Sequence, residues 1–237
     1  YLLDADKAYD VTACLGATTS TGDAEGDIVT HVETVQISMD ALNTVLEQLT
    51  GPIQQVPPMY SALKHQGRPL YEYARRGVTL ERPARAVHIH ALHCRGLEGK
   101  ILHLTVRCSK GTYIRSLVES IGEALGVGGA YVTALHRTYT AGFESAPMWS
   151  LESLEEESAD ARLAHLLPMD IAVMQLPRLE VSPDMVVALR CGKVITDLAD
   201  ASIKPGLTRL YESTGVFLGL GHVMDDGSLQ VKRLLAQ

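Results

Sequence analysis

The sequence predicts an α+β protein: a mixed, largely antiparallel sheet with helices, followed by a small, β-rich C-terminal unit. Two observations lead to the sheet. Segments with alternating apolar side chains are separated by helices of unequal length, and several predicted strands are close neighbours along the chain. Beyond Pro177 short strands dominate. We therefore expect a first domain over residues 1–170 and a second over residues 178–237, near the lower size limit for independent folding.

Strand and helix signals alternate through the first domain. The predicted strands are residues 7–16, with Tyr9 on the apolar face, 28–37, 60–64, 85–95 and 101–108. Ser38 is a typical N-cap of a helix that Gly51 and Pro52 end, and a second helix lies between Pro69 and Gly77. An acidic helix closes this domain near Asp170. In the second domain we expect a small helix between Pro183 and Cys191 with a Gly192 cap, and a hairpin at 225–227.

The stretch CSKGTYIRSL, residues 108–117, contains an arginine in an unfavourable position. Apolar residues at helical spacing begin at Ile114, so Thr112 is the expected N-cap and Arg115 falls in the first helical turn. Backbone N–H groups already supply about half a positive charge at that end. A buried or half-buried arginine there therefore requires an anion, either a structural carboxylate or a group in a functional site.

The composition is that of an ordinary globular protein, with 46% hydrophobic and 21% charged residues in 237. No apolar run is long enough to span a bilayer, which argues against a membrane partner. The four cysteines are scattered without a C-x-x-C pair, so we expect reduced thiols and a cytoplasmic location. The chain begins with Tyr1, and we expect the printed sequence to be a piece of a longer polypeptide.

The net charge of −7 conceals a basic middle segment. Residues 64–115 hold eleven basic and three acidic residues, and the segments on either side are acidic. Tyrosines lie within or beside this segment: Tyr60, Tyr71, Tyr73 and Tyr113. Arginine, lysine and tyrosine together are typical of surfaces that contact phosphates and stack on bases. A solvated surface with ordinary charges is the alternative.

Three short motifs resemble ligand sites but lack the required spacing. In HIHALHC, residues 88–94, strand alternation places His88 and His90 on one face and His93 on the other, so we expect no metal site. DAEGD, residues 23–27, lacks the later glycine and glutamate of a calcium loop and is expected to be a polar turn. GVGGA, residues 126–130, follows a helix instead of preceding one and is expected to end it.

Four longer stretches, in this order, are similar to one family. They are DKAYDVTACLGATTSTGDAEGDIV, VPPMYSALKHQGRPLYEYARRG, CSKGTYIRSL followed by IGEALG, and GVFLGLGHVMDDGSLQVKRLL. They resemble the bacterial tRNA pseudouridine synthase B family, TruB. The resemblance implies a catalytic domain of the pseudouridine synthase type and a small PUA-like RNA-binding domain at the C-terminus.

The resemblance implies an RNA-modifying isomerase that converts a T-loop uridine of tRNA to pseudouridine, as a monomer and without cofactor or metal. The uridine would be flipped into a pocket. By motif, Tyr9 would stack on the base and help to move a proton, and Tyr113 and Leu135 would line the substrate site. Lys64 would contact RNA near the entrance. Arg115 would pair with the nucleophilic aspartate and keep it ionised.

The chain departs from the family in one important respect. The family's nucleophile belongs to a histidine-glycine-leucine-aspartate-proline type motif, which does not occur here. Asp4, Asp6 and Asp10 flank Tyr9 but do not match it. We therefore expect this chain alone to be inactive on tRNA. The alternative function is a catalytically silent RNA-binding or RNA-folding module.

Overall fold

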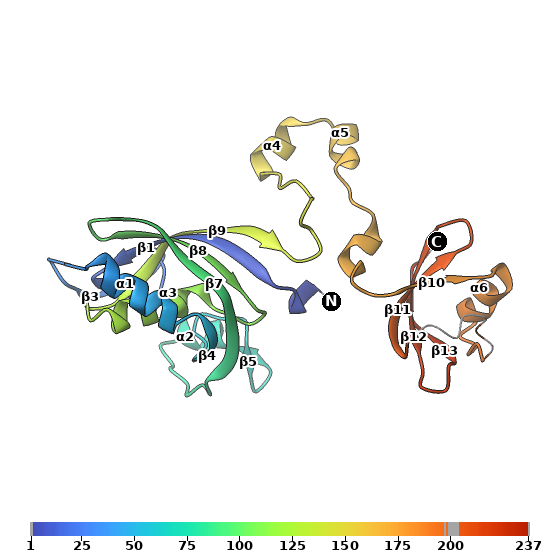
Figure 1. Ribbon diagram of the computed structural model, residues 1–237, viewed down its shortest axis with the longest axis horizontal. Coiled ribbons are helices and arrows are strands. Elements are labelled where there is room, and N and C mark those ends of the chain that lie inside the picture. Colours follow the sequence, from blue (N-terminus) through green and yellow to red (C-terminus); the bar gives the residue numbers. More distant parts are fainter. Residues whose placement is uncertain (1, 197, 199–203, 237) are drawn as a thin grey trace. The chain divides into compact units, whose positions relative to one another are not determined.

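The computed structural model describes residues 2–196, 198 and 204–236 (Figure 1). The chain forms two compact units, one of residues Leu3–Ala141 and the other mainly of residues Gly142–Gln237. The boundaries expected at residues 170 and 178 remain a prediction. Each unit has its own hydrophobic core and its own principal sheet, as the α+β prediction requires.

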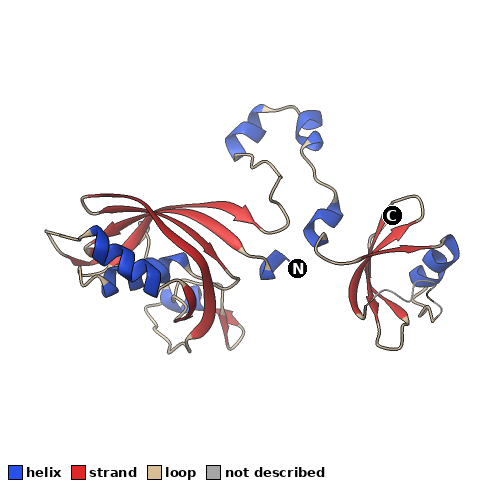
Figure 2. Cartoon of the chain, viewed as in Figure 1, coloured by secondary structure: helices blue, strands red, loops and turns tan. Residues whose placement is uncertain are grey.

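The first unit is built on a five-stranded sheet in which every pairing is antiparallel (Figure 2). The strand order is β4-β7-β8-β1-β9. The strands are β1 (Lys7–Leu15), β4 (Gly51–Gln55), β7 (Arg85–Glu98), β8 (Ile101–Cys108) and β9 (Ala130–Thr140). The strands predicted at residues 7–16, 85–95 and 101–108 are thus confirmed. β1 lies between β8 and β9, so Tyr9 is in the interior of the sheet.

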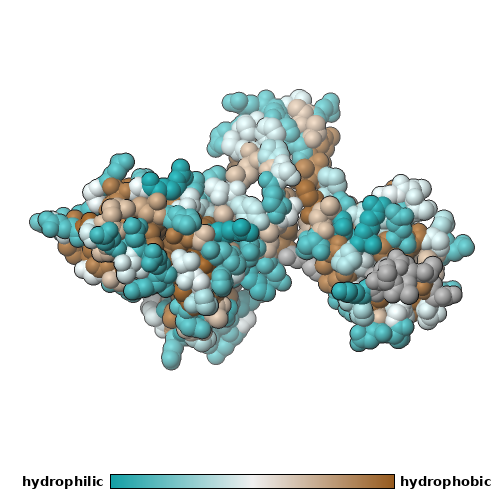
Figure 3. Space-filling view, viewed as in Figure 1, coloured by the Kyte–Doolittle hydropathy of each residue, from teal (hydrophilic) through white to brown (hydrophobic). Residues whose placement is uncertain are grey.

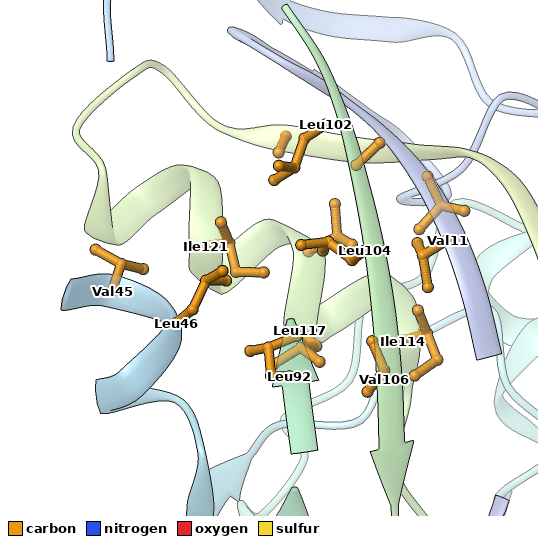
Figure 4. Packing of buried hydrophobic residues seen from close by; sticks show 14 of the residues in the cluster. Val11, Val45, Leu46, Leu92, Leu102, Leu104, Val106, Ile114, Leu117 and Ile121 are labelled. Atoms are coloured by element: carbon orange, nitrogen blue, oxygen red, sulfur yellow. The ribbon is translucent and has the colours of Figure 1, made fainter. Parts of the chain in front are cut away.

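Two helices, α1 (Met39–Gln48) and α3 (Ile114–Ala124), bury their apolar sides against one face of this sheet (Figure 4). The predicted cap of α1 is confirmed, because the Ala41 N–H donates to Ser38 Oγ at 3.1 Å. Leu117 of α3 is completely buried among Val11, Leu104 and other core residues. Truncating such a leucine to alanine typically costs about 2–5 kcal/mol. Packing on the sheet therefore holds the start of α3 in place.

Short elements decorate this unit. β2 (Ala17–Thr19) pairs with β3 (Ile28–His31), and β5 (Lys64–His65) pairs with β6 (Arg68–Pro69). A 3-10 turn covers Leu2–Asp4, and α2 covers Leu70–Ala74. The strand predicted at residues 28–37 ends early at His31, and the strand predicted at 60–64 is confined to the β5 hairpin. The predicted helix between Pro69 and Gly77 is present but shorter.

In the second unit, the single acidic helix predicted near residues 150–170 is wrong. Ser150 and Ser158 each cap a separate short helix, which divides the segment, and a 3-10 helix follows. Apolar side chains remain exposed along it, among them Leu151, Leu166 and Met169, and Figure 3 shows apolar surface on this segment. The elements are α4 (Leu151–Glu156), α5 (Ala159–Ala164) and η2 (Met169–Val173).

The rest of the second unit is a four-stranded sheet of order β10-β11-β12-β13 with one helix. Its elements are β10 (Arg178–Val181), α6 (Pro183–Arg190), β11 (Gly206–Glu212), β12 (Phe217–Val223) and β13 (Leu229–Leu234). The β10–β11 pair is parallel and the other pairs are antiparallel. The predicted helix ends before Gly192, which has a positive φ of 72°, and the predicted turn at 225–227 joins β12 to β13.

Candidate active site

Tyr9 and Leu135 lie on neighbouring strands and on the sheet face that carries the core. Register pairs Tyr9 with Arg137 and Val11 with Leu135 across β1 and β9. The Tyr9 ring packs partly buried against the core, and the Arg137 guanidinium lies 5.6 Å from its centroid, within cation–π range. Leu135 is 47% exposed. An aromatic ring and an exposed apolar side chain thus lie side by side, which suits contact with a planar base.

The turn that leads into α3 is held by a buried glutamine. Gln55, which is 6% exposed, accepts the Tyr113 N–H through Oε1 at 2.7 Å and donates from Nε2 to the Tyr113 carbonyl at 3.1 Å. The predicted cap is wrong: Tyr113 occupies the N-cap position, and the Thr112 hydroxyl donates to the Ser109 carbonyl instead. A side-chain cap is not needed, because the Gln55 amide fixes the backbone of the cap residue.

Arg115 lies in the first turn of α3, as the sequence predicts, and it contacts three acceptors. Nη1 donates to the Thr21 carbonyl and to Asp23 Oδ2, both at 2.9 Å, and Nη2 donates to the Tyr60 carbonyl at 2.6 Å. The Arg115 and Asp23 side chains are 22% and 27% exposed, so the pair is largely removed from water. The anion that this arginine meets within the chain is therefore Asp23.

The loop that carries Asp23 is itself held in place. Asp23 Oδ1 accepts the Thr21 hydroxyl and the Glu25 N–H, and the Val132 N–H of β9 donates to the Gly22 carbonyl. The DAEGD stretch is a turn, as predicted, and one of its carboxylates has a specific partner. Gly22 has a φ of +75°, and a Cβ there would lie 2.7 Å from a carboxylate oxygen of Glu119. This position therefore requires glycine in order to pass over α3.

Glu119 lies one helical turn after Arg115 and faces the Gly22 backbone. Burial raises the pKa of its carboxyl group, and the like charge of Glu123 raises it further. Arg115 and Arg82 oppose this increase without cancelling it. Glu119 is therefore a partly desolvated carboxyl group directly beneath the loop that holds Asp23.

Lys64 lies apart from these residues, in the β5–β6 hairpin. A turn at Gln66 and Gly67, both with positive φ, joins the two strands. The Tyr73 hydroxyl donates to the His65 carbonyl at 3.3 Å and ties α2 to the hairpin. The Lys64 side chain is exposed. The basic, tyrosine-rich stretch is thus a small folded projection whose cations face solvent.

The structure brings the predicted site residues together in two pairs. Tyr9 and Leu135 form one pair on the sheet, and Tyr113 and Arg115 form the other at the start of α3. Ile114, between the latter two, packs in the same core as Tyr9. Asp23 and Gln55 were not predicted. Only a polar turn marks the first and an unremarkable strand end marks the second, so neither had a distinctive sequence signal.

The three aspartates near Tyr9 each have a basic partner. Asp4 accepts from Lys110 Nζ at 2.7 Å, and this contact lowers the pKa of Asp4. Asp6 lies 3.1 Å from His90 Nε2, and Asp10 accepts from Arg95 Nη1 at 2.9 Å. These carboxylates therefore have polar partners at the surface, and none of them is the Arg115 partner.

The predicted placement of His93 is wrong. A β-bulge between Ile89 and Ala91 shifts the alternation, so that His93 pairs with Thr105 and lies on the same sheet face as His88. The His88 and His90 rings are 4.8 Å apart. Even so, within the part of the chain that the structure describes, no three His, Cys, Asp or Glu residues are grouped to hold a metal ion. No helix of that part is both long and apolar enough to cross a membrane.

Family models match almost the whole chain. Residues 1–114 match the N-terminal domain of the TruB family pseudouridylate synthases. Residues 115–174 match the tRNA pseudouridylate synthase B C-terminal domain, and residues 177–235 match the C-terminal region of pseudouridine synthase II TruB.

Known proteins agree with these matches. The tRNA pseudouridine synthase B of Legionella pneumophila is 43% identical over 236 residues, which is 100% of this chain and 77% of that protein. The enzyme of the same name from Aromatoleum aromaticum is 45% identical, covering 99% of this chain and 74% of that protein. A chain in the crystal structure of a Cbf5-Nop10-Gar1 complex has the same fold, with a TM-score of 0.68 and 24% identity over 98% of this chain and 67% of its own length. The chain belongs to the TruB family of pseudouridine synthases.

Proposed function

We propose that this chain forms most of an enzyme that isomerises a uridine in the T loop of tRNA to pseudouridine. The observation that carries the proposal is the similarity, over the whole chain, to proteins named tRNA pseudouridine synthase B. The reaction breaks the bond between N1 of uracil and C1′ of the ribose and forms a bond between C5 and C1′. The proton on C5 leaves and N1 gains a proton, so neither an oxidant nor a second substrate is needed.

The target base must leave its stack before the glycosidic bond can react. Tyr9 would stack on the flipped base, and Leu135, exposed on the neighbouring strand, would clamp it. Tyr113 would line the same site from the start of α3, where Gln55 fixes its backbone. Lys64 and the basic projection around it would contact the RNA backbone.

Arg115 would orient the nucleophilic carboxylate and keep it ionised. A guanidinium has five N–H donors, and three of those in Arg115 are used by Thr21, Asp23 and Tyr60. Two donors therefore remain for a further carboxylate, from a side chain that is still partly exposed. Asp23 holds the guanidinium in position for that carboxylate and is a positioning residue.

The nucleophile itself would come from the histidine-glycine-leucine-aspartate-proline type motif, which these 237 residues do not contain. We therefore propose that the printed chain alone binds tRNA and does not modify it. The test incubates a tRNA transcript, tritiated at uracil C5, with the purified chain and separately with a polypeptide that also carries the motif. Tritium release is expected only with the longer polypeptide.

An RNA-binding or RNA-folding module is the second candidate, and the missing motif favours it. The same experiment separates the two functions. If neither polypeptide releases tritium and both bind the transcript, the chain is a binding module. Tritium release by the printed chain above a protein-free blank would refute the role given to the missing aspartate.

A further inference from the structure

A small cavity between the β5–β6 hairpin and the segment before β7 is lined by an unusual number of cations. Its volume is about 70 Å³, and its lining includes Lys64, His65, Arg82 and Arg85, with Glu81 as the single carboxylate. A water molecule occupies about 30 Å³ in the liquid, so the cavity has room for a group of a few heavy atoms. Its composition favours an anion.

The cations of this cavity have no described carboxylate partner, unlike three other cations of the same unit. Lys110, Arg95 and Arg115 each have a carboxylate oxygen within 2.9 Å. By contrast, no described carboxylate lies within ion-pair distance of Lys64, Arg82 or Arg85, although described residues surround them. Three unpaired cations around one hollow repel each other unless an anion joins them.

Arg82 is the most informative member. Its Nε atom is buried and has no hydrogen-bond acceptor, one of two such side-chain atoms among the described residues. Leaving a buried donor unsatisfied costs about 1–3 kcal/mol, and more when the group is charged. The folded chain thus keeps a donor in an unfavourable place.

Glu119 is a carboxylate whose charge interacts with Arg82, but it does not serve as the missing acceptor. Arg82 lowers the pKa of Glu119, so the two groups interact electrostatically. They form no hydrogen bond or ion pair, and burial leaves the pKa of Glu119 raised overall. An acceptor for Arg82 must therefore come from outside the described chain.

The cavity is connected to the candidate active site through one strand pair. Arg85, on its wall, is the register partner of Gln55 at the end of β4. Gln55 holds the backbone of Tyr113, which is two residues before Arg115. A group bound in the cavity would therefore lie beside the structure that positions the start of α3.

We propose that this cavity binds a phosphate group of the RNA backbone, with Arg82 and Arg85 as its principal donors. The proposal rests on the proposed RNA substrate. A phosphate oxygen would satisfy Arg82 Nε, and its single negative charge would reduce the repulsion among the three cations. An anchored phosphate would fix the register of the strand next to the flipped uridine, which contacts to bases alone would not do.

The test measures the affinity of the chain for an unmodified T-arm stem-loop RNA at several salt concentrations. The variants are Arg82→Met and, in case the first fails to fold, Arg85→Gln at an exposed position. Each is expected to raise Kd about tenfold and to reduce the slope of log K against log salt by about 0.7–0.9. Arg82→Met should also melt at the same temperature as the unmodified chain or higher, whereas a purely structural arginine would lower it.

Arg95→Gln is the matched control, because Arg95 is exposed and already paired with Asp10. It should leave the salt slope unchanged. A second arm compares melting in inorganic phosphate with melting in chloride at equal ionic strength. One outcome is that phosphate stabilises the unsubstituted chain but not Arg82→Met, while both bind the RNA equally well. That result would identify a site for free phosphate and would overturn the proposal. Unchanged affinity and slope in both variants would also overturn it. If the unmodified chain does not bind the RNA, the proposed function fails instead.

Discussion

Asp23→Asn should uncouple Arg115 from its loop, and the size of the effect can be estimated from the structure. The pair has an N···O distance of 2.9 Å and side-chain exposures of 22% and 27%. At an effective dielectric constant of 20, charges about 4 Å apart attract by about 4 kcal/mol before desolvation is counted. Desolvation and partial exposure reduce this, and hydrogen bonds to charged groups typically contribute about 1.5–3 kcal/mol. We expect a coupling free energy of about 1.5–2 kcal/mol.

A double-mutant cycle with Asp23→Asn and Arg115→Met measures this coupling directly. The single tryptophan, Trp149, belongs to the other unit, so an assay that reads the residues of α3 themselves is needed. Amide hydrogen exchange of α3 under native conditions is therefore the appropriate assay. The exposed pair Asp4–Lys110, with exposures of 70% and 60%, is the control and should couple more weakly than the Asp23–Arg115 pair. If the Asp23–Arg115 coupling does not exceed that of the control pair, the assignment of Asp23 as the structural anion is wrong.

Three further predictions concern neighbouring residues. Because the folded-state pKa of Glu119 is raised, ionisation of this carboxyl group destabilises the fold as pH rises. Glu119→Gln should therefore stabilise the chain at pH 7 by at most about 1 kcal/mol and have little effect below pH ~4. If the variant and the unsubstituted chain have the same urea midpoint at pH 7 as well as below pH ~4, this explanation is contradicted. Gln55→Leu removes two hydrogen bonds to the Tyr113 backbone and should lower the free energy of unfolding in urea by about 1–3 kcal/mol. The Tyr113 amide should exchange faster, and an unchanged exchange rate would contradict the role given to Gln55. In a polypeptide that carries the nucleophile, Arg115→Lys should lower kcat about 100-fold with little change in the Kd for tRNA, because a lysine cannot donate to several fixed acceptors at once. Equal losses of turnover and of tRNA affinity would instead indicate that Arg115 contacts a phosphate.

The sequence predicted those parts of the fold in which local signals agree with packing. Burial alternates along the whole of β8 and along β1 from Val11 on, and Ser38 caps α1 as its type suggests. The errors occur where tertiary contacts replace a local preference. Thr112 is a good N-cap by type, but the Gln55 amide hydrogen-bonds the backbone of the next residue, Tyr113, which occupies the N-cap position instead. The bulge near His90 is equally invisible in a pattern of alternating residues, and it alone moves His93 to the other face.

The candidate site was predicted only in part, for a related reason. Tyr9, Tyr113 and Arg115 belong to long motifs, so their positions followed from resemblance and from the strand and helix pattern. Asp23 lies in a polar turn that periodicity does not describe, and it meets Arg115 only because Gly22 permits the loop to cross α3 closely. The unsatisfied Nε of Arg82 has no sequence signature, because it results from the absence of a hydrogen-bond acceptor near it among the described residues of the folded chain.

Arg115 now has a consistent physical explanation. A cation in the first turn of α3 costs about 0.3–1 kcal/mol against the helix dipole, and one carboxylate with two backbone carbonyls offsets this cost. The same contacts fix the guanidinium before any substrate arrives and leave two donors unused. Preorganised donors of this kind lower a barrier because they need not reorient during the reaction. The Asp23 contact is therefore compatible with the proposed function: it fixes the direction of the guanidinium, and the unused donors would determine from which side the proposed second carboxylate approaches.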